Sequence, residues 1–310
     1  MSKIVGVGKR LPKRRMFNHE FEDKIDTSDE WIRSRTGITA RHIIEEETLT
    51  ELSVAAVREA LAMAGIEAAD VGVLLTATMT ADDRMPSMAC RIAGELAIED
   101  CLCFDVNAAC SGFIFAYITA DRLLRSAKKR YALVVGAEAL SRVLDWQDRN
   151  TCILFGDGAG AVLLEADDHD TPYVAGTKPD MSGQLTLAQT GRDFLGMKGR
   201  EVYKFATHIV PQLLFDLCAQ CGMETAQIDK VVAHQANIRI LQSAAEKTGI
   251  DIQRWFSNLA DHGNTSAASV PMALYDAYKS GFLQKGERVA LAGFGGGLTY
   301  GGVLVNWTLA

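Results

Sequence analysis

The chain lacks the long apolar runs and the basic charge that would place it at a membrane or on a nucleic acid. No stretch approaches the ~20 consecutive apolar residues that a membrane span needs, and the apolar run at residues 4–8 is too short for the core of a signal peptide. The formal net charge of the 310 residues is −7, which disfavours a general binder of nucleic acid or anionic lipid. We therefore expect a cytoplasmic protein whose acidic partners dock on local basic patches.

The sequence also lacks the ligand spacing of a structural metal site. Its seven cysteines include two close pairs, Cys101 with Cys103 and Cys218 with Cys221. A zinc site needs four ligands close together, whereas these pairs lie far apart in the sequence and have no histidine at ligand spacing. We expect reduced thiols that mostly pack as small hydrophobic side chains, with at most one of them chemically active.

A third absence concerns nucleotide-binding loops. No G-x-x-x-x-G-K-[ST] motif occurs, and the glycine clusters at 156–160 and 293–297 run into apolar strands instead of helices. Nucleotide binding by these loops is therefore disfavoured. We interpret both clusters as tight turns beside a catalytic centre, where backbone N–H groups can meet an oxyanion.

What the sequence does contain is a weak internal repeat. Residues 64–75 and 221–232 share Gly, Glu, Ala and apolar positions at an offset of 222 − 65 = 157, about half the chain. The helical stretches that precede them are 51–64 and 201–221, and the strands that they lead into are 71–77 and 228–234. The repeat predicts two halves built alike, residues 1–166 and 167–310, with regular patterning fading over residues 167–199.

Further short apolar runs indicate the strands of a sheet. They lie at 103–106, 131–135, 159–164, 288–292 and 300–307. Because strands and helices alternate, the fold class is α/β. The helix predicted over 201–221 contains Pro211, which should kink it without ending it because the apolar pattern resumes at Leu213.

Cys110 is the strongest candidate for a nucleophile. It follows Asn107-Ala-Ala and precedes a predicted helix at 113–124 that is apolar nearly all round, which indicates a buried helix. A cysteine at the first turn of such a helix meets the helix dipole and free N–H groups, which favour thiolate over thiol. The alternative is an inert buried cysteine, the usual fate of this residue.

His234 and Asn264 are candidates for the same site. His234 ends the strand 228–234, where open α/β sheets place ligand chemistry, although a structural histidine is the alternative. Asn264 precedes a second helix of small residues, where it could simply cap the helix. By the internal offset Cys110 maps to residue 267, within three residues of Asn264, so we expect the two at equivalent helix starts that face each other.

At these residues the sequence resembles the β-ketoacyl-acyl-carrier-protein synthase III family of condensing enzymes, in the thiolase superfamily. The resemblance covers nearly the whole chain. The motifs that carry it are Asp26-Thr-Ser-Asp-Glu-Trp-Ile, Arg35-Thr-Gly-Ile, Asn107-Ala-Ala-Cys-Ser-Gly-Phe, Phe155-Gly-Asp-Gly-Ala-Gly, His234-Gln-Ala-Asn-Ile-Arg, His262-Gly-Asn-Thr-Ser-Ala-Ala-Ser-Val-Pro and Phe294-Gly-Gly-Gly-Leu-Thr-Tyr-Gly. It implies a thiolase-like duplicated fold of α-β-α-β-α layers with two pseudo-symmetric halves.

The resemblance also implies a reaction, the decarboxylative condensation of an acyl-coenzyme A primer with malonyl-acyl carrier protein that starts fatty-acid biosynthesis. The catalytic triad is then Cys110, His234 and Asn264. Cys110 attacks the primer thioester, and the backbone N–H groups of Cys110 and Gly296 hold the oxyanion. His234 and Asn264 hydrogen-bond the thioester carbonyl of the malonyl substrate. Acyl-coenzyme A is a substrate, and no metal or redox cofactor is implied.

The substrate contacts follow from the same resemblance. Trp31 and Arg149 match positions that sandwich the adenine of coenzyme A, and Arg35 matches a nearby coenzyme-binding position; an exposed Trp and surface arginines are the alternative. The residues that match the basic patch for acyl carrier protein are Lys204, Arg239 and Lys247. Glu246 stands where the family often has another base, which predicts weaker or differently arranged docking.

Met85 distinguishes this chain from many members of the family, which carry a Phe there that reaches across a homodimer to close the acyl pocket. A flexible Met can yield more room than a rigid ring, so the expected primer is acetyl-coenzyme A or a longer or more branched acyl-coenzyme A. The homodimer is expected from the resemblance alone.

The alternative function is that of a secondary-metabolite ketosynthase or acyltransferase with the same centre and another acceptor. A non-catalytic partner subunit would be expected to lack one of the three catalytic residues, and all are present.

Overall fold

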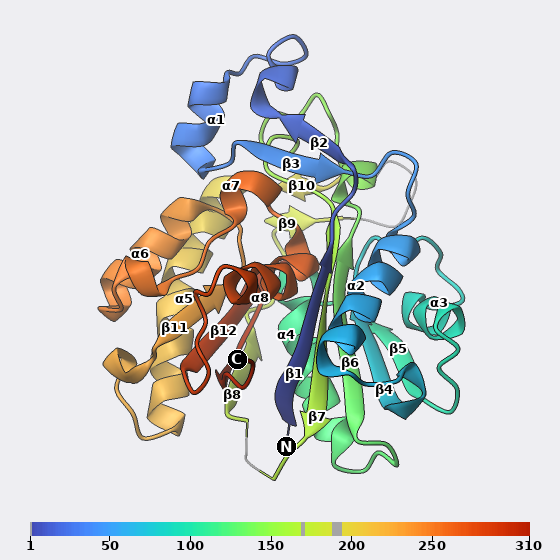
Figure 1. Cartoon of the computed structure of the whole chain (residues 1–310). Helices are drawn as coiled ribbons and strands as arrows, with labels where there is room; N and C mark the ends of the chain where they lie inside the picture. The colour runs from blue at the N-terminus through green and yellow to red at the C-terminus, as the bar shows by residue number, and fades with distance from the viewer. Residues whose placement is uncertain (1, 169–170, 188–193) are drawn as a thin grey trace.

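The computed structural model describes residues 2–168, 171–187 and 194–310, which build two main β-sheets (Figure 1). The first has the strand order β1-β7-β6-β4-β5 and the second β11-β12-β13-β8. The strands of the first sheet are β1 (Ser2–Arg10), β4 (Val71–Ala77), β5 (Leu102–Val106), β6 (Tyr131–Glu138) and β7 (Gly158–Ala166). Those of the second are β8 (Tyr173–Thr177), β11 (Lys230–Ala233), β12 (Arg288–Gly295) and β13 (Thr299–Asn306).

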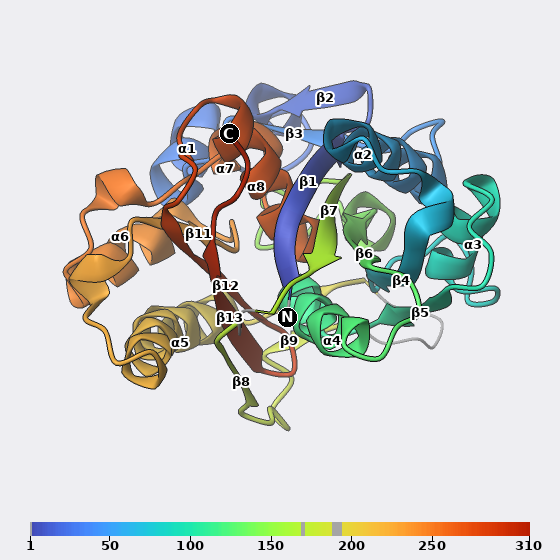
Figure 2. The ribbon, with the colours of Figure 1, turned by 60° about the horizontal axis from the view of Figure 1, so that its bottom comes forward.

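Helices form three layers around these two sheets (Figure 2). Between the sheets, α4 (Gly112–Leu124) and α8 (Ser269–Lys279) contact strands of both. On the outer face of the first sheet lie α2 (Leu49–Ala64) and α3 (Met88–Glu95), and on that of the second lies α5 (Gly199–Gln220) with α6 (Ile238–Thr248) beside it. The predicted α/β class and the α-β-α-β-α layering are therefore confirmed.

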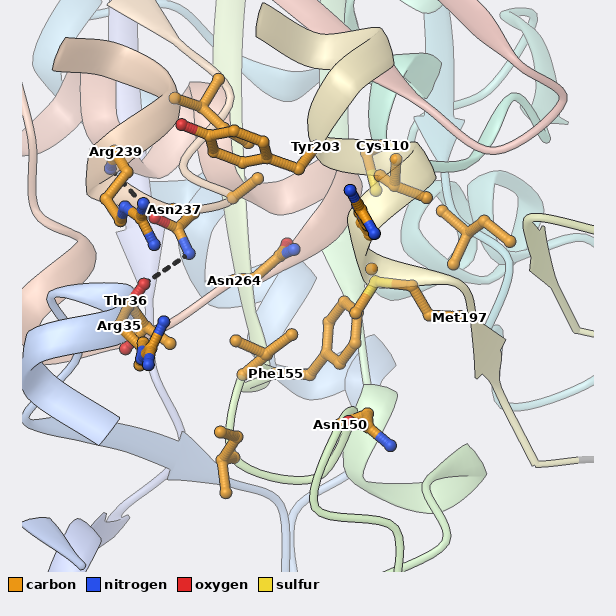
Figure 3. A pocket seen from close by; sticks show the side chains of 18 of the residues that line it. Arg35, Thr36, Cys110, Asn150, Phe155, Met197, Tyr203, Asn237, Arg239 and Asn264 are labelled. Atoms are coloured by element: carbon orange, nitrogen blue, oxygen red, sulfur yellow. Dashed lines mark hydrogen bonds between the residues drawn. The ribbon is translucent and has the colours of Figure 1, made fainter. Parts of the chain in front are cut away.

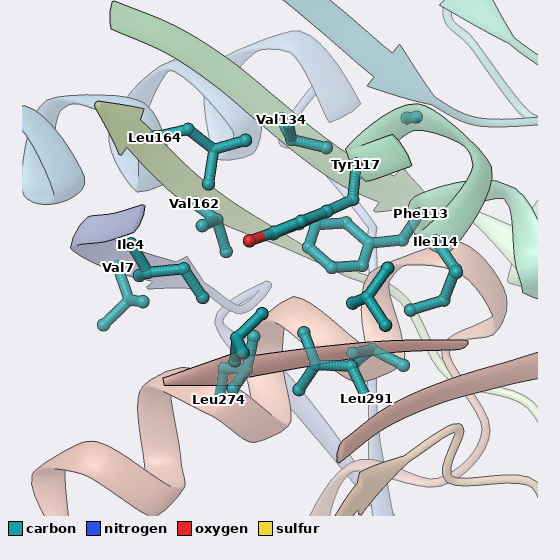
Figure 4. Close-up of a cluster of buried hydrophobic side chains, with 14 of the residues drawn as sticks. Ile4, Val7, Phe113, Ile114, Tyr117, Val134, Val162, Leu164, Leu274 and Leu291 are labelled. Atoms are coloured by element: carbon teal, nitrogen blue, oxygen red, sulfur yellow. The ribbon is translucent and has the colours of Figure 1, made fainter. Parts of the chain in front are cut away.

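The central position of α4 follows from its composition. Its Phe113, Ile114 and Tyr117 are fully buried, because a helix that is apolar on every side must be covered on every side. Figure 4 shows them in one cluster with Ile4, Val7, Val134, Val162, Leu164, Leu274 and Leu291, which come from β1, β6, β7, α8 and β12. This core fixes the start of α4, and with it the position of the preceding residue pair Cys110-Ser111.

The offset of 157 found in the sequence recurs in the structure. It separates the starts of β6 and β12 (288 − 131 = 157) and those of α4 and α8 (269 − 112 = 157). It also separates two 3-10 turns, η3 (Ala109–Ser111) and η7 (Ser266–Ala268), which contact each other. Each turn opens on a left-handed residue, Ala109 with φ 46° and Ser266 with φ 47°. Such a φ costs a non-glycine residue about 1–3 kcal/mol, so both halves hold the same strained strand-to-helix turn.

The two main sheets draw on separate parts of the chain, since β7 ends at Ala166 and β8 begins at Tyr173. The division into 1–166 and 167–310 stays a prediction. Of the stretch in which patterning fades, residues 169–170 and 188–193 lie outside the described residues. The remainder includes a short strand pair that the pattern did not predict, β9 (Leu185–Thr186) with β10 (Gly196–Met197).

Several other elements were not predicted or differ from the prediction. The elements missed include β1, which pairs antiparallel with β7, the edge strand β8 of the second sheet, the pair β2 (Arg14–Phe17) and β3 (Ala40–Ile43), α1 (Asp29–Thr36) and α7 (Leu259–His262). Helix α5 continues through Pro211 as expected. The prediction of a tight turn at 156–160 was wrong for its second half, because Gly158 and Gly160 belong to β7. A Cβ at Gly160 would lie 2.7 Å from Met272 N, so glycine there lets α8 approach the strand closely.

Among the described residues, none of the helices combines the length and apolar character that a membrane crossing requires.

Candidate active site

Cys110 lies at the junction of two cavities. One, of ≈ 590 Å³, is lined by Cys110 together with His234, Asn264, Trp31 and Arg149 among others. The other, of ≈ 1140 Å³, also reaches Cys110. Its wall combines apolar side chains, among them Met79, Phe115, Val143, Leu187 and Leu195, with polar and charged ones such as Asp83, Arg84 and Asp105. The structure thus brings the three predicted catalytic residues to one cavity, and a second cavity leads from the same sulfur.

The first cavity has a polar side away from the sulfur (Figure 3). Cys110 lies on one side of it, Arg35, Thr36, Asn237 and Arg239 lie on the other, and Asn264 lies between. Asn237 joins two segments distant in the sequence, since its Nδ2 donates to Arg35 O at 3.0 Å and its Oδ1 accepts from Arg239 N at 2.9 Å. The entrance therefore carries positive charge, while the inner end holds uncharged polar groups.

The prediction that Cys110 favours the thiolate was wrong for the free protein. Cys110 lies in η3, before α4 begins, and its residue is 5% exposed. Burial raises the pKa of the Cys110 thiol to about 12, which the nearby Ser266 hydroxyl and the backbone N–H of Cys110 reduce only in part. The resting form is therefore the neutral thiol, because the loss of water around sulfur outweighs the groups that favour its anion.

His234 is also uncharged at rest. It follows the last residue of β11, as predicted, and its N–H donates to Ala292 O at 2.7 Å. A hydrogen bond of 2.6 Å joins its Nδ1 to Ser269 Oγ on α8, and Phe294 packs edge-on against the ring. Burial lowers the pKa of His234 to about 3. With Nδ1 occupied, Nε2 is the ring nitrogen left for the cavity that His234 lines.

The side chain of Asn264 has one group in a structural hydrogen bond, Oδ1, and one group that can bind a ligand, Nδ2. Its Oδ1 accepts from Ser266 N at 2.9 Å, so the side chain caps the first N–H of η7 from the position before the N-cap residue, which is Thr265 and not Asn264 as the alternative interpretation had it. Its backbone N–H donates to Leu154 O at 2.8 Å. Within the described part of the chain, no hydrogen bond engages Asn264 Nδ2, which leaves a donor for the cavity. Capping and substrate binding are therefore compatible.

The second glycine cluster packs directly against Cys110. A Cβ built at Gly295 would lie 2.7 Å from Cys110 Cβ and 3.1 Å from Cys110 N. Gly296 lines the second cavity, and a Cβ there would lie 3.3 Å from Ala109 Cβ. The prediction of a tight turn at 293–297 was wrong for Gly293 and Gly295, which belong to β12; the turn begins at Gly296, whose backbone lies next to η3.

The three residues predicted to bind coenzyme A meet at the entrance of the first cavity. The guanidinium carbon of Arg149 lies 4.7 Å from the centre of the Trp31 ring, and that of Arg35 lies 6.0 Å from it. Arg149 also donates to Asp26 O at 2.6 Å. Trp31 is 36% exposed, so a flat aromatic face stands at the mouth of the cavity with cations on it.

The three predicted carrier-protein contacts lie on the neighbouring helices α5 and α6. Arg239 lines the cavity mouth, with its guanidinium carbon 5.7 Å from the centre of the Tyr203 ring. Lys204 pairs with Glu201 at 3.1 Å, and Lys247 donates to Thr207 O at 2.7 Å. Lys204 and Lys247 are therefore already held by partners in the chain, and Arg239 is the one of these three that lines the cavity.

Met85 lies outside both cavities of the single chain and is 86% exposed. Its neighbours Asp83 and Arg84 line the second cavity. A role in closing an acyl pocket therefore requires a partner subunit and stays a prediction.

Two residues of the site were missed by the sequence analysis. Ser269, which bonds His234, is the counterpart of Gly112 at the offset of 157. Glu138 is a fully buried carboxyl at the end of β6, and it interacts electrostatically with Cys110. A charged residue directly after the apolar run Val134-Val-Gly-Ala was a signal that could have identified Glu138.

Comparisons with known proteins agree with this geometry. The family described as 3-Oxoacyl-[acyl-carrier-protein (ACP)] synthase III matches residues 104–179, and the one described as its C terminal matches residues 218–307. The β-ketoacyl-[acyl-carrier-protein] synthase III of Aquifex aeolicus is 40% identical over 308 residues and 99% of each chain. That of Neisseria meningitidis is 41% identical over 317 residues, again covering 99% of each chain.

Solved structures give the same result. The synthase III of Aquifex aeolicus superposes with a TM-score of 0.95 at 39% identity and covers 99% of this chain and 100% of its own. The priming β-ketosynthase of the R1128 polyketide biosynthetic pathway also reaches 0.95, at 34% identity, over 99% of this chain and 96% of its own. The thiolase-like architecture is therefore shared with both.

Proposed function

The chain belongs to the 3-oxoacyl-[acyl-carrier-protein] synthase III family of condensing acyltransferases, and we propose that Cys110, His234 and Asn264 perform the condensation that starts fatty-acid biosynthesis. The observation that supports these roles is the place of Cys110 where a cavity with a cationic entrance meets a second cavity that offers apolar side chains such as Phe115, Leu187 and Leu195. A thioester that enters from the cationic side can present its carbonyl to sulfur and leave its acyl chain among these apolar side chains.

In the first half-reaction, Cys110 sulfur attacks the carbonyl carbon of the acyl-coenzyme A primer. The bond from carbon to the coenzyme sulfur breaks, the acyl group stays on Cys110, and the thiol proton of Cys110 ends on the departing coenzyme. The backbone N–H groups of Cys110 and Gly296 stabilise the tetrahedral oxyanion. Because Cys110 is a neutral thiol at rest, it must lose its proton as it attacks.

In the second half-reaction, malonyl-acyl carrier protein loses carbon dioxide to give an enolate, which attacks the acyl-cysteine and releases the 3-oxoacyl product and Cys110. Asn264 Nδ2 and His234 Nε2 donate to the enolate oxygen. When Ser269 donates to Nδ1, the single proton of the neutral imidazole lies on Nε2, as this role requires. The Ser269 hydroxyl has one proton to donate to Nδ1, while its oxygen accepts from Gln235 N at 3.4 Å.

The size of the primer's acyl group is inferred from the volume of the second cavity. Its volume of ≈ 1140 Å³ far exceeds what an acetyl group needs, and Met85 replaces a rigid ring, so we propose a primer longer or more branched than acetyl. Purified protein is incubated with malonyl-acyl carrier protein and acetyl-, isobutyryl- or octanoyl-coenzyme A, and the products are followed by mass. Isobutyryl- or octanoyl-coenzyme A should yield 3-oxoacyl-carrier protein at least as fast as acetyl-coenzyme A, and Met85→Phe should restore the preference for acetyl.

The primer panel can also reject the proposal. If Cys110 becomes acylated and no primer yields a 3-oxoacyl-carrier protein, the synthase assignment is wrong and the acyltransferase alternative replaces it. A secondary-metabolite ketosynthase is favoured by one observation, the close structural match to a priming β-ketosynthase of a polyketide pathway. Replacing the carrier protein of fatty-acid synthesis by a polyketide carrier distinguishes the two, because the preferred acceptor gives the higher kcat/KM.

The coenzyme A contacts give a separate prediction. Arg149 now lies directly on the Trp31 ring, so adenine can stack between them only after Arg149 moves. Since stacking of a base on an aromatic ring is worth about 1–3 kcal/mol, Trp31→Ala should raise KM for acyl-coenzyme A about tenfold and leave kcat within twofold. An acyl donor on a short pantetheine thiol, which lacks adenine, is the control. An equal rise of KM for that donor would contradict the stacking role.

Features of this chain's surface support the proposed partners. Arg239, Lys204 and Lys247 would meet the acidic carrier protein beside the cavity mouth. For the homodimer, the support is β5, an edge strand of the first sheet whose Leu102 and Phe104 are 51% and 36% exposed. Exposed apolar side chains on an unpaired strand edge favour pairing with a second copy. A cytoplasmic location and the lack of a cofactor stay predictions.

A further inference from the structure

Glu138 is a buried carboxyl that the condensation described above does not use. It ends β6, its residue is 0% exposed, and it interacts electrostatically with Cys110 on η3. From the segment after β4 it meets Met79 and Thr80, and from η7 it meets Ser266 and Ala267, all of them uncharged. A buried carboxylate without a cation beside it is costly, so its presence behind the nucleophile calls for an explanation.

The two oxygens of Glu138 have different surroundings. Oε2 accepts from Thr80 Oγ1 at 2.5 Å and from Met79 N at 3.3 Å. Thr80 Oγ1 accepts from Ala139 N at 2.8 Å, and its own proton can bond Glu138 Oε2. Oε1, in contrast, is buried and has no hydrogen-bond partner of standard geometry among the described residues. Since two donors can meet Oε2, the neutral acid is best accommodated with Oε2 as its carbonyl oxygen and the proton on Oε1.

The group that the Oε1 proton can meet is Ser266, whose hydroxyl is likewise buried without a standard partner in the described chain. This hydroxyl lies near enough to the Glu138 carboxyl and to the Cys110 sulfur to lower the pKa of both. Ser266 is the left-handed residue that opens η7. Ser266 on η7 therefore interacts with both Glu138 and Cys110.

Burial sets the protonation state of Glu138. It raises the pKa of the carboxyl to about 7 against the opposing effects of Thr80, Met79, Ser266 and Ala267. Below that pH the group is neutral, and above it a negative charge develops. That charge raises the pKa of the Cys110 thiol, since two anions close together in a buried site disfavour each other.

We propose that Glu138 is a positioning residue for the nucleophile, which works as a neutral carboxylic acid behind Cys110 and whose ionisation holds back formation of the Cys110 thiolate. The inference rests on the proposed role of Cys110. With Glu138 in place, a rise in pH increases the thiolate fraction of Cys110 less than it would increase that of an isolated thiol. Glutamine reproduces the neutral form, because its carbonyl can accept from Thr80 and Met79 and its amide can donate to Ser266.

The test is the pH profile of Cys110 alkylation by iodoacetamide, which forms a thioether and releases iodide and needs neither primer nor carrier protein. Rates are read by mass spectrometry of the Cys110 peptide from pH 6 to 9. For Glu138→Gln, we expect the rate relative to wild type to be near 1 at pH 6 and to rise to about tenfold at pH 8.5, as a displacement of about one unit in thiol pKa would give. Asp157→Asn is the matched control.

Asp157 is also a fully buried carboxyl with a raised pKa, but it bonds Ser141 and Ile44 and lines neither cavity. For Asp157→Asn, the alkylation rate relative to wild type should stay constant with pH. A constant ratio for Glu138→Gln overturns the inference. Should that variant not fold, wild type alone decides: a rate that rises tenfold per pH unit throughout, without a shallower portion around pH 7, overturns the inference too. Because alkylation bypasses condensation, failure of the proposed function would leave this result intact.

Discussion

Replacing Cys110 by serine is expected to abolish stable acylation by acyl-coenzyme A and to lower condensation by at least about a thousandfold, as expected when the nucleophile of a covalent mechanism is lost. Burial already raises the pKa of the Cys110 thiol to about 12. A hydroxyl in the same apolar surroundings ionises far less readily than a thiol, so serine cannot replace sulfur. The measurement is intact mass after incubation with the primer, together with the rate of 3-oxoacyl product formation.

Cys218→Ser is the matched control for this substitution. Cys218 is also buried and free, but it lies on α5 and lines neither cavity. This variant should acylate at the wild-type rate and to one acyl group per chain. Full acylation of another cysteine in Cys110→Ser would show that the nucleophile has been misassigned, whatever the condensation rate.

The local pattern predicted much of the fold because apolar periodicity reports which face of an element is buried. The strand at 71–77 was predicted with its observed bounds, and the helix at 113–124 lies within one residue of α4. β1 was missed because its place depends on antiparallel pairing with β7, more than a hundred residues away. Pairing between distant segments leaves little trace in either segment alone.

The candidate site could be predicted in its residues but not in its electrostatics. His234 and Asn264 were found from a strand end and a repeat, both of which are properties of the sequence. The ionisation state of Cys110 was predicted wrongly, because a helix start is visible in the sequence whereas the loss of water around a sulfur depends on the packing of η3 against β12 and η7. Glu138 belongs to the same packing, since β6 contacts η7 as β12 contacts η3.

Asn264→Asp separates the two half-reactions and also decides between the structural and catalytic roles of Asn264. Aspartate keeps an oxygen that accepts from Ser266 N, so the cap of η7 is retained. It loses the Nδ2 donor and places a negative charge beside a developing enolate. Since loss of one donor to an oxyanion costs about 10²–10³ in rate, decarboxylation and condensation should fall by at least that factor, while acylation of Cys110 falls far less.

Asn264→Ala is the companion variant, because it removes both the cap and the donor. Its condensation should be as slow as that of Asn264→Asp, but its free energy of unfolding should be lower by about 1 kcal/mol, the usual cost of losing a cap. Carbon dioxide release from malonyl-carrier protein measures the first effect, and thermal or denaturant unfolding measures the second. If Asn264→Asp condenses at the wild-type rate and only Asn264→Ala is impaired, Asn264 serves to cap η7 and the donor to the enolate lies elsewhere in the cavity.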